Sequence, residues 1–571
     1  MELRRGQLHR LLTGITHPVT LVAVCLAGIA VSYSAENALA TVPFAMAVLA
    51  TIAASLFLIS KRLAFSIYVA WMLVAIETLV SAIKFQMRGF SFHFYDAVFV
   101  ASDKEVYPFL VGSYLHLVLL VLLALASCVA FAIGVFRLDT ARSFGLSGRW
   151  ALLGLSALLL PLTLPADASE ERHSYYLRGR HITAFFVSFL DLEDYFTETD
   201  LQKRLAETQP QTKFEDSVDC GDLADQPDVF VVLEESAADM ADFPQVAGAG
   251  DFIHRYAPST GEVHPMGVEV FGAGTWISNL SLMTGLSSSD FGWRSPYLTI
   301  TLQDRVKGAL PDLFKRCGYR TVALTPFEFN FANEGRFLGS IGFDEVIDYH
   351  AMGLPTYHMR DKSYFDAAER LIAEHHKVDK RPLFLAIQTM FAHSDYDLRM
   401  EPDLVVAGEP FNVDPQVNEY VRRLASAQSD FEAFLQHRKS DPAGRESVVL
   451  EFGDHQSYVL RPFVDAKAGP DALVDKSSFA YRTYYAITAF NRDLDRSAVP
   501  RGRLDIAYLG ATLLDVAHLP SSPMMRDLIG LRDHCQGQFY LCADRPAVDA
   551  HLRRRIDAGM LDILRGAMPG A

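Results

Sequence analysis

The sequence predicts two kinds of structure in one chain: a membrane domain of five helices, followed by a soluble α/β domain with a largely parallel sheet. Hydrophobic residues make up 50% of the 571 residues and charged residues only 21%, which is more apolar than an average soluble protein. The long apolar stretches all lie in the first 165 residues. After them, apolar β-rich runs alternate with helical patterns, as they do in α/β domains.

Five apolar stretches in the first part have the length needed to cross the hydrocarbon core of a bilayer, roughly 17–25 residues. They are Pro18–Ser34, Ala40–Ser60, Leu63–Ile83, Tyr114–Phe136 and Trp150–Pro165. A cleaved signal peptide is a single short apolar stretch, so a series of five predicts a permanent membrane anchor.

Basic residues near the ends of these stretches predict how the chain crosses the membrane, because Lys and Arg favour the cytoplasmic side. In chain order they are Arg4, Arg5, Arg10, Lys61, Arg62, Arg137, Arg142 and Arg149. We therefore expect a multi-pass protein of the inner (plasma) membrane with a cytoplasmic N-terminus. Everything after Pro165 is then exported to the periplasm or cell exterior.

The expected exported part is strongly acidic. Residues 1–165 contain 11 Lys+Arg and 7 Asp+Glu, which leaves 41 and 61 for the remainder, a net charge of −20 there. Such a surface disfavours a phosphate backbone, so no nucleic-acid partner is expected. Within the third apolar stretch, Glu77 is a candidate functional group because an ionisable side chain is costly there. A hydrogen bond to a neighbouring helix, or a reach toward Lys84, explains Glu77 equally well.

The composition divides the chain into three segments. We expect a transmembrane domain at 1–166, an amphipathic connector at 167–211 and an exported domain at 212–571. The connector contains the apolar-rich stretch His181–Phe196, which favours a helix lying along the membrane or along the exported domain.

Polar side chains follow three predicted strands of the exported domain. The strands and the residues after them are Asp228–Leu233 with Glu234 and Glu235, Ser447–Phe452 with Asp454 and His455, and Pro382–Gln388 with His393. The ligand crevice of an open α/β sheet lies outside the carboxyl ends of its strands, where these groups can meet. Carboxylates with an imidazole suit Zn²⁺ or Mn²⁺. Each fragment alone is more often ordinary loop chemistry.

A hydroxyl group is predicted at the start of a helix at Thr275. Gly272 and Gly274 precede it, and the pattern becomes helical from Trp276 onward. The positive end of a helix favours an anion at this position. A threonine that also ligated a divalent cation would lose its proton more readily and attack phosphorus. A plain helix cap is the alternative explanation of Thr275.

The order of these motifs carries a resemblance. A strand ending in Glu-Ser, then Gly-x-Gly-Thr-Trp, then His, then Gly-Asp-His, after five membrane stretches, resembles the sulfatase-like phosphoglycerol and phosphoethanolamine transferases of the alkaline phosphatase superfamily. That group includes lipoteichoic acid synthase and periplasmic glucan phosphoglycerol transferase. The resemblance is densest at Pro227–Asp239, Gly272–Gly285, Leu310–Asp344 and Val448–Gln456.

The resemblance implies an alkaline-phosphatase-like fold and one divalent metal ion, Mn or Zn with Mg as a further option. The matching metal ligands are Glu235, Thr275, Asp454 and His455, and Thr275 is also the nucleophile. Glu235 is chosen over Glu234 because members of this family have a Glu-Ser pair after the strand, and Glu235 precedes Ser236. His393 is expected to contact the substrate phosphate or leaving group as a catalytic residue, and Trp276 and Arg336 are expected substrate contacts.

The function implied is transfer of phosphoglycerol from phosphatidylglycerol, through a phospho-threonine, to an extracytoplasmic glycan or lipid acceptor. The Gly-Thr-Trp run resembles the phosphoglycerol branch, and His393, Asp395 and Tyr396 offer hydrogen bonds to glycerol hydroxyls. The alternatives are a phosphoethanolamine transferase acting on lipid A or a glycan, a metal-dependent phosphodiesterase or hydrolase of the same superfamily, and a non-enzymatic membrane sensor.

Two departures from known patterns qualify the resemblance. Family members that form phosphoglycerol esters often carry Asn-His, whereas this chain has Ala392 before His393. The Cys/Ser-x-Pro-x-Arg segment that true sulfatases need does not surround Thr275, which disfavours sulfate-ester hydrolysis.

The cysteines fit an exported domain. Two lie in the apolar stretches and four beyond them, and an even number of exported cysteines is compatible with disulfides. Cys535 and Cys542 close a short loop and are the first expected pair, which leaves Cys220 and Cys317 as a second possible pair. A metal site that uses Cys535 and Cys542 with His534 and His551 is the competing interpretation.

Overall fold

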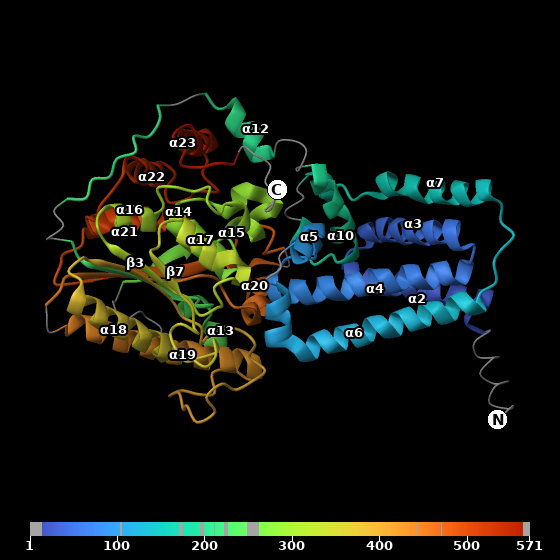
Figure 1. Ribbon diagram of the computed structural model, residues 1–571, viewed down its shortest axis with the longest axis horizontal. Helices are drawn as coiled ribbons and strands as arrows, with labels where there is room; N and C mark the ends of the chain where they lie inside the picture. The colour runs from blue at the N-terminus through green and yellow to red at the C-terminus, as the bar shows by residue number, and fades with distance from the viewer. Residues whose placement is uncertain are drawn as a thin grey trace. The chain divides into compact units, whose positions relative to one another are not determined.

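The computed structural model describes the chain except for residues 1–13, 103–105, 171–174, 194–198, 210–211, 222–225, 248–261, 442–443, 470 and 564–571. The chain forms two compact units, Met1–Glu193 and Asp194–Ala571 (Figure 1). The predicted connector at 167–211 is divided between them.

The first unit contains five helical stretches long and apolar enough to cross a membrane, counted over the described residues. The helices are α2 (Pro18–Glu36), α3 (Val42–Ser60), α4 (Leu63–Arg88), α6 (Val106–Leu138) and α7 (Leu146–Thr163), and the short η1 (Leu39–Thr41) leads into α3. Large apolar side chains on them are exposed, Leu123 by 68% and Leu162 by 72%, as expected of surfaces that face lipid. The predicted five-helix domain is confirmed.

The basic turns of the first unit lie at one end of its helices. The N–H of Arg142, between α6 and α7, donates to the carbonyl of Lys61, between α3 and α4, at 2.9 Å. The Arg149 guanidinium donates to the carbonyl of Leu58. These two basic segments therefore belong to the same side of any membrane that the helices cross.

The other end of the first unit carries short polar and aromatic elements. They are α5 (Phe94–Ser102), α8 (Asp167–Glu170), α10 (Ile182–Val187) and η2 (Ser188–Leu192). Glu36, at the end of α2, accepts hydrogen bonds from the N–H and the hydroxyl of Thr183. Lys84 pairs with Asp96 at 2.6 Å rather than with Glu77, whose two carboxylate oxygens have no hydrogen-bond partner among the described residues.

The second unit is built on an eight-stranded sheet of order β4-β3-β5-β1-β6-β7-β2-β8. The strands are β1 (Asp228–Glu234), β2 (His264–Gly267), β3 (Arg320–Leu324), β4 (Glu345–Ile347), β5 (Leu383–Gln388), β6 (Ser447–Gly453), β7 (Arg482–Phe490) and β8 (Leu504–Asp505). Only β7 runs antiparallel to its two neighbours, so the predicted largely parallel sheet is confirmed.

Helices cover both faces of this sheet (Figure 1). Val231 and Leu233 of β1 pack in a core with α14 (Thr275–Thr284) and α16 (Leu310–Arg316). Phe230 and Val232 point the other way, toward α18 (Asp361–Val378) and α19 (Pro415–Lys439). Burial on both faces explains why these strands read as continuous hydrophobic runs. The remaining helices are α12 (Asp200–Glu207), α13 (Pro244–Ala247), α15 (Leu298–Thr301), α17 (Glu334–Ser340), α20 (Arg461–Ala468), α21 (Leu509–Val516), α22 (Pro523–His534) and α23 (Arg545–Asp557).

Strands β5, β1 and β6 are neighbours at the centre of the sheet and run parallel. Their carboxyl ends therefore lie side by side, as predicted from the three polar strand ends. Glu234 is the last residue of β1 and Glu235 is the first residue after it. Because successive strand residues face opposite sides, only one of these two carboxylates points toward the crevice.

Two disulfides link cysteines of the second unit, Cys220 with Cys317 and Cys535 with Cys542. The oxidised Cys535 and Cys542 leave no thiolate for a metal ion. The histidines of the competing interpretation pair with carboxylates instead, His534 with Asp544 and His551 with Asp527.

Candidate metal and nucleophile site

Glu235 is held at the end of β1 by the residue that follows it. Ser236 adopts a left-handed backbone with φ 53°, which turns the chain sharply out of the strand. Its hydroxyl donates to Glu235 Oε1 and its N–H donates to Asp454 Oδ1, both at 2.8 Å. The N–H of Glu235 donates to Thr389 Oγ1 at 3.1 Å. Ser236 thus binds the carboxylates of both Glu235 and Asp454.

Asp454 and His455 follow β6 directly, after a glycine. A Cβ on Gly453 would lie 2.0 Å from the carbonyl oxygen of Ala237, closer than any real contact. Gly453 therefore allows the chain after β1 to cross the end of β6. This close approach places Asp454 beside Glu235 and leaves both buried.

Thr275 is the first residue of α14, preceded by Gly274 with φ 103°. Glycine adopts this backbone without the strain that a side chain would bring. Gly274 is the cap residue, so Thr275 is not a plain helix cap and its hydroxyl is left for other contacts. The hydroxyl of Ser278 donates to the main-chain oxygen of Asp454 at 2.7 Å, which ties α14 to the end of β6.

The four predicted ligands meet in one buried cluster. Thr275 Oγ1 donates to Glu235 Oε2 at 3.1 Å and lies 3.5 Å from His455 Nε2. His455 Nε2 lies 3.2 Å from Asp454 Oδ2 and 3.6 Å from Glu235 Oε1. Glu235, Asp454 and His455 each offer one ligand atom, all within 4.8 Å of one another.

The cluster fits a divalent cation. His455 Nδ1 lies 3.0 Å from the carbonyl of Gln456, which only accepts, so Nδ1 carries the proton and Nε2 presents a lone pair to the carboxylates. Asp454 Oδ2 is buried without a hydrogen-bond partner among the described residues. Burial first and the charge of Asp454 second raise the pKa of Glu235. Oxygen and imidazole donors that face one another in this way suit Zn²⁺ or Mn²⁺.

His393 lies in the loop after β5, beside this cluster. Burial lowers the pKa of His393 to about 3. The hydrogen bond to the main-chain oxygen of Ser394 opposes this shift, and the positive charge of Arg423 adds to it. Its ring meets that of Phe327 edge to face, with centroids 5.9 Å apart. The imidazole is therefore neutral at neutral pH and able to orient a phosphate or hydroxyl oxygen.

The two other predicted substrate contacts differ in their surroundings. Trp276 is buried, and its Nε1–H donates to the carbonyl of Pro296 at 3.2 Å. Arg336 is exposed on α17. It comes two residues after the buried Glu334, so the helical period places the two side chains on opposite sides of α17.

Sequence reasoning missed the residues that surround this cluster. Glu334 accepts hydrogen bonds from Asn279 Nδ2 and Gln388 Nε2, both at 2.8 Å. Arg423, in α19, is fully buried and donates to the main-chain oxygen of His393 at 2.9 Å. The only signal for Glu334 was its place in the segment NFANEGR, and no local pattern marks Arg423.

Comparisons with known proteins agree with this reading of the second unit. The sulfatase family model matches residues 268–480. An uncharacterized protein of Haemophilus influenzae is 25% identical over 324 residues, which are 53% of this chain and 56% of that protein. The chain thus spans little more than half the length of this relative.

Two of the solved structures that are similar to this chain are transferases. The integral membrane lipooligosaccharide phosphoethanolamine transferase A of Neisseria meningitidis has a TM-score of 0.49 and 14% identity, covering 86% of this chain and 96% of that one. The phosphoglycerol transferase GacH of Streptococcus pyogenes, in complex with sn-glycerol-1-phosphate, has a TM-score of 0.46 and 16% identity over 65% and 90%.

The matched segment holds Thr275, His393, Asp454 and His455. The cluster of Glu235, Thr275, Asp454 and His455 lies at the carboxyl edge of the sheet. The predicted sulfatase-like resemblance is therefore confirmed over residues 268–480, which match the sulfatase family model and follow the five apolar helices in the chain.

Proposed function

We propose that this chain transfers the phosphorylated headgroup of a membrane phospholipid to an acceptor outside the cytoplasm. The observation that carries the proposal is the position of the Thr275 hydroxyl, which is buried, starts a helix and lies within 3.5 Å of both Glu235 and His455. A hydroxyl held among metal ligands at a helix N-terminus is suited to attack phosphorus. The five apolar helices explain how the enzyme meets a lipid donor.

The reaction has two balanced steps. Thr275 Oγ1 gives its proton toward Glu235 Oε2 and attacks the phosphorus, and the bond from phosphorus to the diacylglycerol oxygen breaks. Diacylglycerol leaves with a proton, and a phospho-threonine ester remains. An acceptor hydroxyl then attacks the same phosphorus, the bond from phosphorus to Thr275 Oγ1 breaks, and the proton of the acceptor hydroxyl is passed to Thr275 Oγ1. One divalent ion held by Glu235, Thr275, Asp454 and His455 supplies Lewis acidity and charge neutralisation when bound.

The neutral imidazole of His393 is proposed to contact the reacting phosphate group in addition to Thr275. Neutral imidazole carries one N–H donor and one lone pair, so it can orient either the leaving oxygen or the entering hydroxyl. A phosphate anion beside it stabilises the protonated form and raises its pKa, which makes proton donation accessible only once substrate is bound.

The donor proposed from the sequence resemblance is phosphatidylglycerol, with an extracytoplasmic glycan or lipid as acceptor. One part of that expectation lacks structural support. The Tyr396 hydroxyl donates to the carbonyl of Ala392 and accepts from the Ser457 hydroxyl, both at 2.8 Å. Its proton is therefore already used within the protein and is not offered to a glycerol hydroxyl. Phosphatidylethanolamine is the second candidate donor, favoured by the buried carboxylate of Glu334. Hydrolysis, with water in place of the acceptor, uses the same first step.

The proposed orientation has a cytoplasmic N-terminus and the second unit outside the cytoplasm. It is supported by the basic turns at Lys61 and Arg142, which share one end of the first unit. A reporter active only outside the cytoplasm is expected to be on when fused after Ala166 and off when fused after Arg142. The opposite pattern contradicts the orientation.

Mass spectrometry of the full chain tests the proposed mechanism. Purified protein incubated with Mn²⁺ or Zn²⁺ and each phospholipid should gain the mass of glycerol phosphate or ethanolamine phosphate on the peptide that contains Thr275, with release of diacylglycerol. Thr275→Ala should abolish both signals. Thr284→Ala, at the other end of α14 and equally buried, is the matched control. Normal turnover by Thr275→Ala would disprove the covalent mechanism.

A further inference from the structure

A second buried carboxylate, that of Glu334, lies beside the nucleophile helix. Its Oε1 accepts from Asn279 Nδ2 and from Gln388 Nε2, both at 2.8 Å. Asn279 stands one turn after Thr275 on α14, and side chains four residues apart share a helix face. Gln388 ends β5 and pairs with Leu233, two residues before Glu235. Glu334 is therefore fixed at the carboxyl edge of the sheet, on the crevice side.

Glu334 has no cationic partner among the residues that the structure describes. It is 4% exposed, and the described residues form no salt bridge to it, since both of its donors are neutral amides. Burial raises the pKa of Glu334, the hydrogen bonds from the two amides lower it, and the negative charge of Asp454 adds a smaller upward shift. A buried carboxylate without a countercharge is costly, and proteins normally pair it. The site is therefore complementary to a positive charge from outside the chain.

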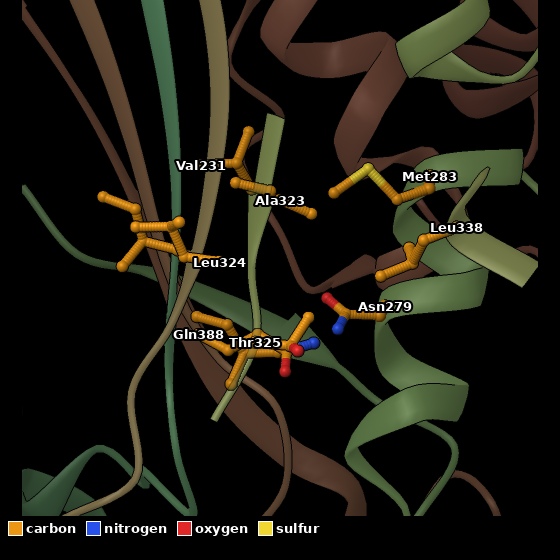
Figure 2. Close-up of a pocket in the computed structure, with 11 residues that line it drawn as sticks. Val231, Asn279, Met283, Ala323, Leu324, Thr325, Leu338 and Gln388 are labelled. Atoms are coloured by element: carbon orange, nitrogen blue, oxygen red, sulfur yellow. The ribbon is translucent and has the colours of Figure 1, made fainter. Parts of the chain in front are cut away.

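A small, mainly apolar cavity is lined in part by the two amide side chains that bind this carboxylate. It measures about 10 Å³ and is lined by Asn279, Thr325 and Gln388 among apolar side chains, a space of about one water molecule. Figure 2 shows the polar ends of these three side chains turned toward one another. Gln388 Oε1 is buried there without a hydrogen-bond partner among the described residues. The amide groups are thus held in place, and the cavity itself is too small for a substrate.

A row of aromatic rings joins the residue after Thr275 to His393, and one of them, Phe331, lies three residues before Glu334 in the sequence. The rings of Trp276 and Phe331 meet edge to face with centroids 6.1 Å apart. Phe331 stacks on Phe327 at 4.5 Å, and Phe327 meets His393 at 5.9 Å. This row runs from the residue after the nucleophile to the histidine opposite. Aromatic faces attract cations, and an ammonium group is recognised by aromatic rings in combination with a carboxylate.

We propose that Glu334 and the aromatic row Trp276–Phe331–Phe327 form a subsite for the primary ammonium group of an ethanolamine headgroup. The inference rests on the proposed headgroup transfer and names its substrate class. The ammonium group lies two carbons beyond the ester oxygen of the phosphate, and Glu334 lies one helical turn from Thr275 through Asn279. The structure thus favours phosphatidylethanolamine over phosphatidylglycerol, which reverses the order taken from sequence resemblance.

Charge, rather than hydrogen bonding, separates the two headgroups at this position. Glycerol hydroxyls can also donate to a carboxylate, but they do so nearly as well to an amide oxygen. An ammonium group gains from the carboxylate charge in a partly dry site and loses that gain with an amide. The isosteric change Glu334→Gln should therefore remove the preference for the ammonium headgroup over the glycerol headgroup and leave the shape of the subsite unchanged.

The test measures binding and turnover separately. Full chain carrying Thr275→Ala, in detergent with Zn²⁺, is titrated calorimetrically with phosphoethanolamine and with sn-glycerol-1-phosphate. Phosphoethanolamine should bind more tightly, and Glu334→Gln should weaken it roughly tenfold or more while glycerol phosphate changes less than about twofold. With Thr275 intact, Glu334→Gln should lower the ratio of phosphatidylethanolamine to phosphatidylglycerol consumed.

Matched variants separate recognition from folding. Glu328→Gln changes a carboxylate in the same segment that makes no hydrogen bond to Asn279 or Gln388 among the described residues, and should leave the ratio unchanged. Phe331→Leu should weaken phosphoethanolamine selectively, whereas Phe329→Leu, 38% exposed, should not. Equal binding of the two phosphates, or equal weakening of both by Glu334→Gln, overturns the subsite. Selective binding with neither lipid consumed retains the subsite and disproves headgroup transfer.

Discussion

The Nε2 atom of His455 lies 3.2 Å from Oδ2 of Asp454, and this oxygen has no hydrogen-bond partner among the described residues. The proton of His455 is on Nδ1, directed at the carbonyl of Gln456. Two facing lone pairs in a buried site repel each other unless a cation lies between them. This pair therefore marks the metal position more sharply than the individual residues do.

Metal binding is expected to stabilise the second unit. A ligand that binds only the folded state at 100 times its Kd adds about 2.7 kcal/mol to the free energy of unfolding. Zn²⁺ or Mn²⁺ should raise the melting temperature of the metal-stripped chain, and Asp454→Asn should remove this rise together with the bound metal. Elemental analysis measures the bound metal and scanning calorimetry measures the melting temperature. The control is Glu345→Gln, which changes an exposed carboxylate. An unchanged response in Asp454→Asn argues against the assigned ligand.

The glycine before Asp454 is expected to be indispensable. Gly453→Ala places a Cβ 2.0 Å from the Ala237 carbonyl, so either the end of β6 or the Ser236 turn must move. Overpacking of this kind typically costs about 1–3 kcal/mol, and the metal ligands on both segments should separate. Gly502→Ala, where a Cβ meets nothing within 4 Å, should be neutral. Chemical denaturation measures the loss of stability, and elemental analysis measures the bound metal. Full metal binding by Gly453→Ala would contradict the prediction that the metal ligands separate.

The parts of this structure that were predictable from sequence are those set by local pattern. Continuous apolar runs marked β1, β5 and β6 because a sheet buried on both faces needs them. The polar residues after them marked the crevice because parallel strands end at one edge. The choice of Glu235 over Glu234 came from the family resemblance, and the alternation of strand side chains explains it.

The parts that escaped prediction depend on register and on main-chain contacts. Arg336 and Glu334 lie in one short segment, and only the register of the seven-residue helix α17 decides which of them faces inward. A short helix at the edge of a domain carries too little periodicity to show that register. The antiparallel placement of β7 and the position of β2 beside it depend on long-range pairing, which leaves no local mark.

His393 is expected to make the chain sensitive to acid. Its pKa is lowered to about 3 in the folded state, against 6.5 for an unperturbed histidine, so the unfolded chain binds the extra proton first. As pH falls from about 6.5 to about 3, the free energy of unfolding should therefore fall. His393→Gln should lose this part of the pH dependence. Unfolding midpoints should be compared across this pH range for wild type, for His393→Gln and for a control, His437→Gln, at an exposed histidine. Parallel curves for wild type and His393→Gln would exclude a contribution of His393 to the pH dependence.

Two adjacent arginines of α19 hold successive parts of the loop that carries His393. Arg423 donates to the main-chain oxygens of His393 and Asp395 at 2.9 Å and of Leu398 at 2.6 Å. Arg422 donates to those of Met400 and Leu404. Both are fully buried and share the carboxylate of Glu419, so they differ mainly in which part of the loop they hold.

Arg423→Lys is therefore expected to impair catalysis through His393, and Arg422→Lys is not. A lysine keeps the charge near Glu419, but its single ammonium group cannot reach three carbonyls in the fork geometry of a guanidinium. Freed carbonyls let the loop open locally, so amide hydrogen exchange should rise across 393–398 in Arg423→Lys and across 400–404 in Arg422→Lys. Misplacing a reacting-group contact by about 1 Å can cost on the order of 100-fold in rate, and kcat should fall more than KM rises. Both variants lose a buried arginine, so equal losses of kcat would show that Arg423 acts only through stability.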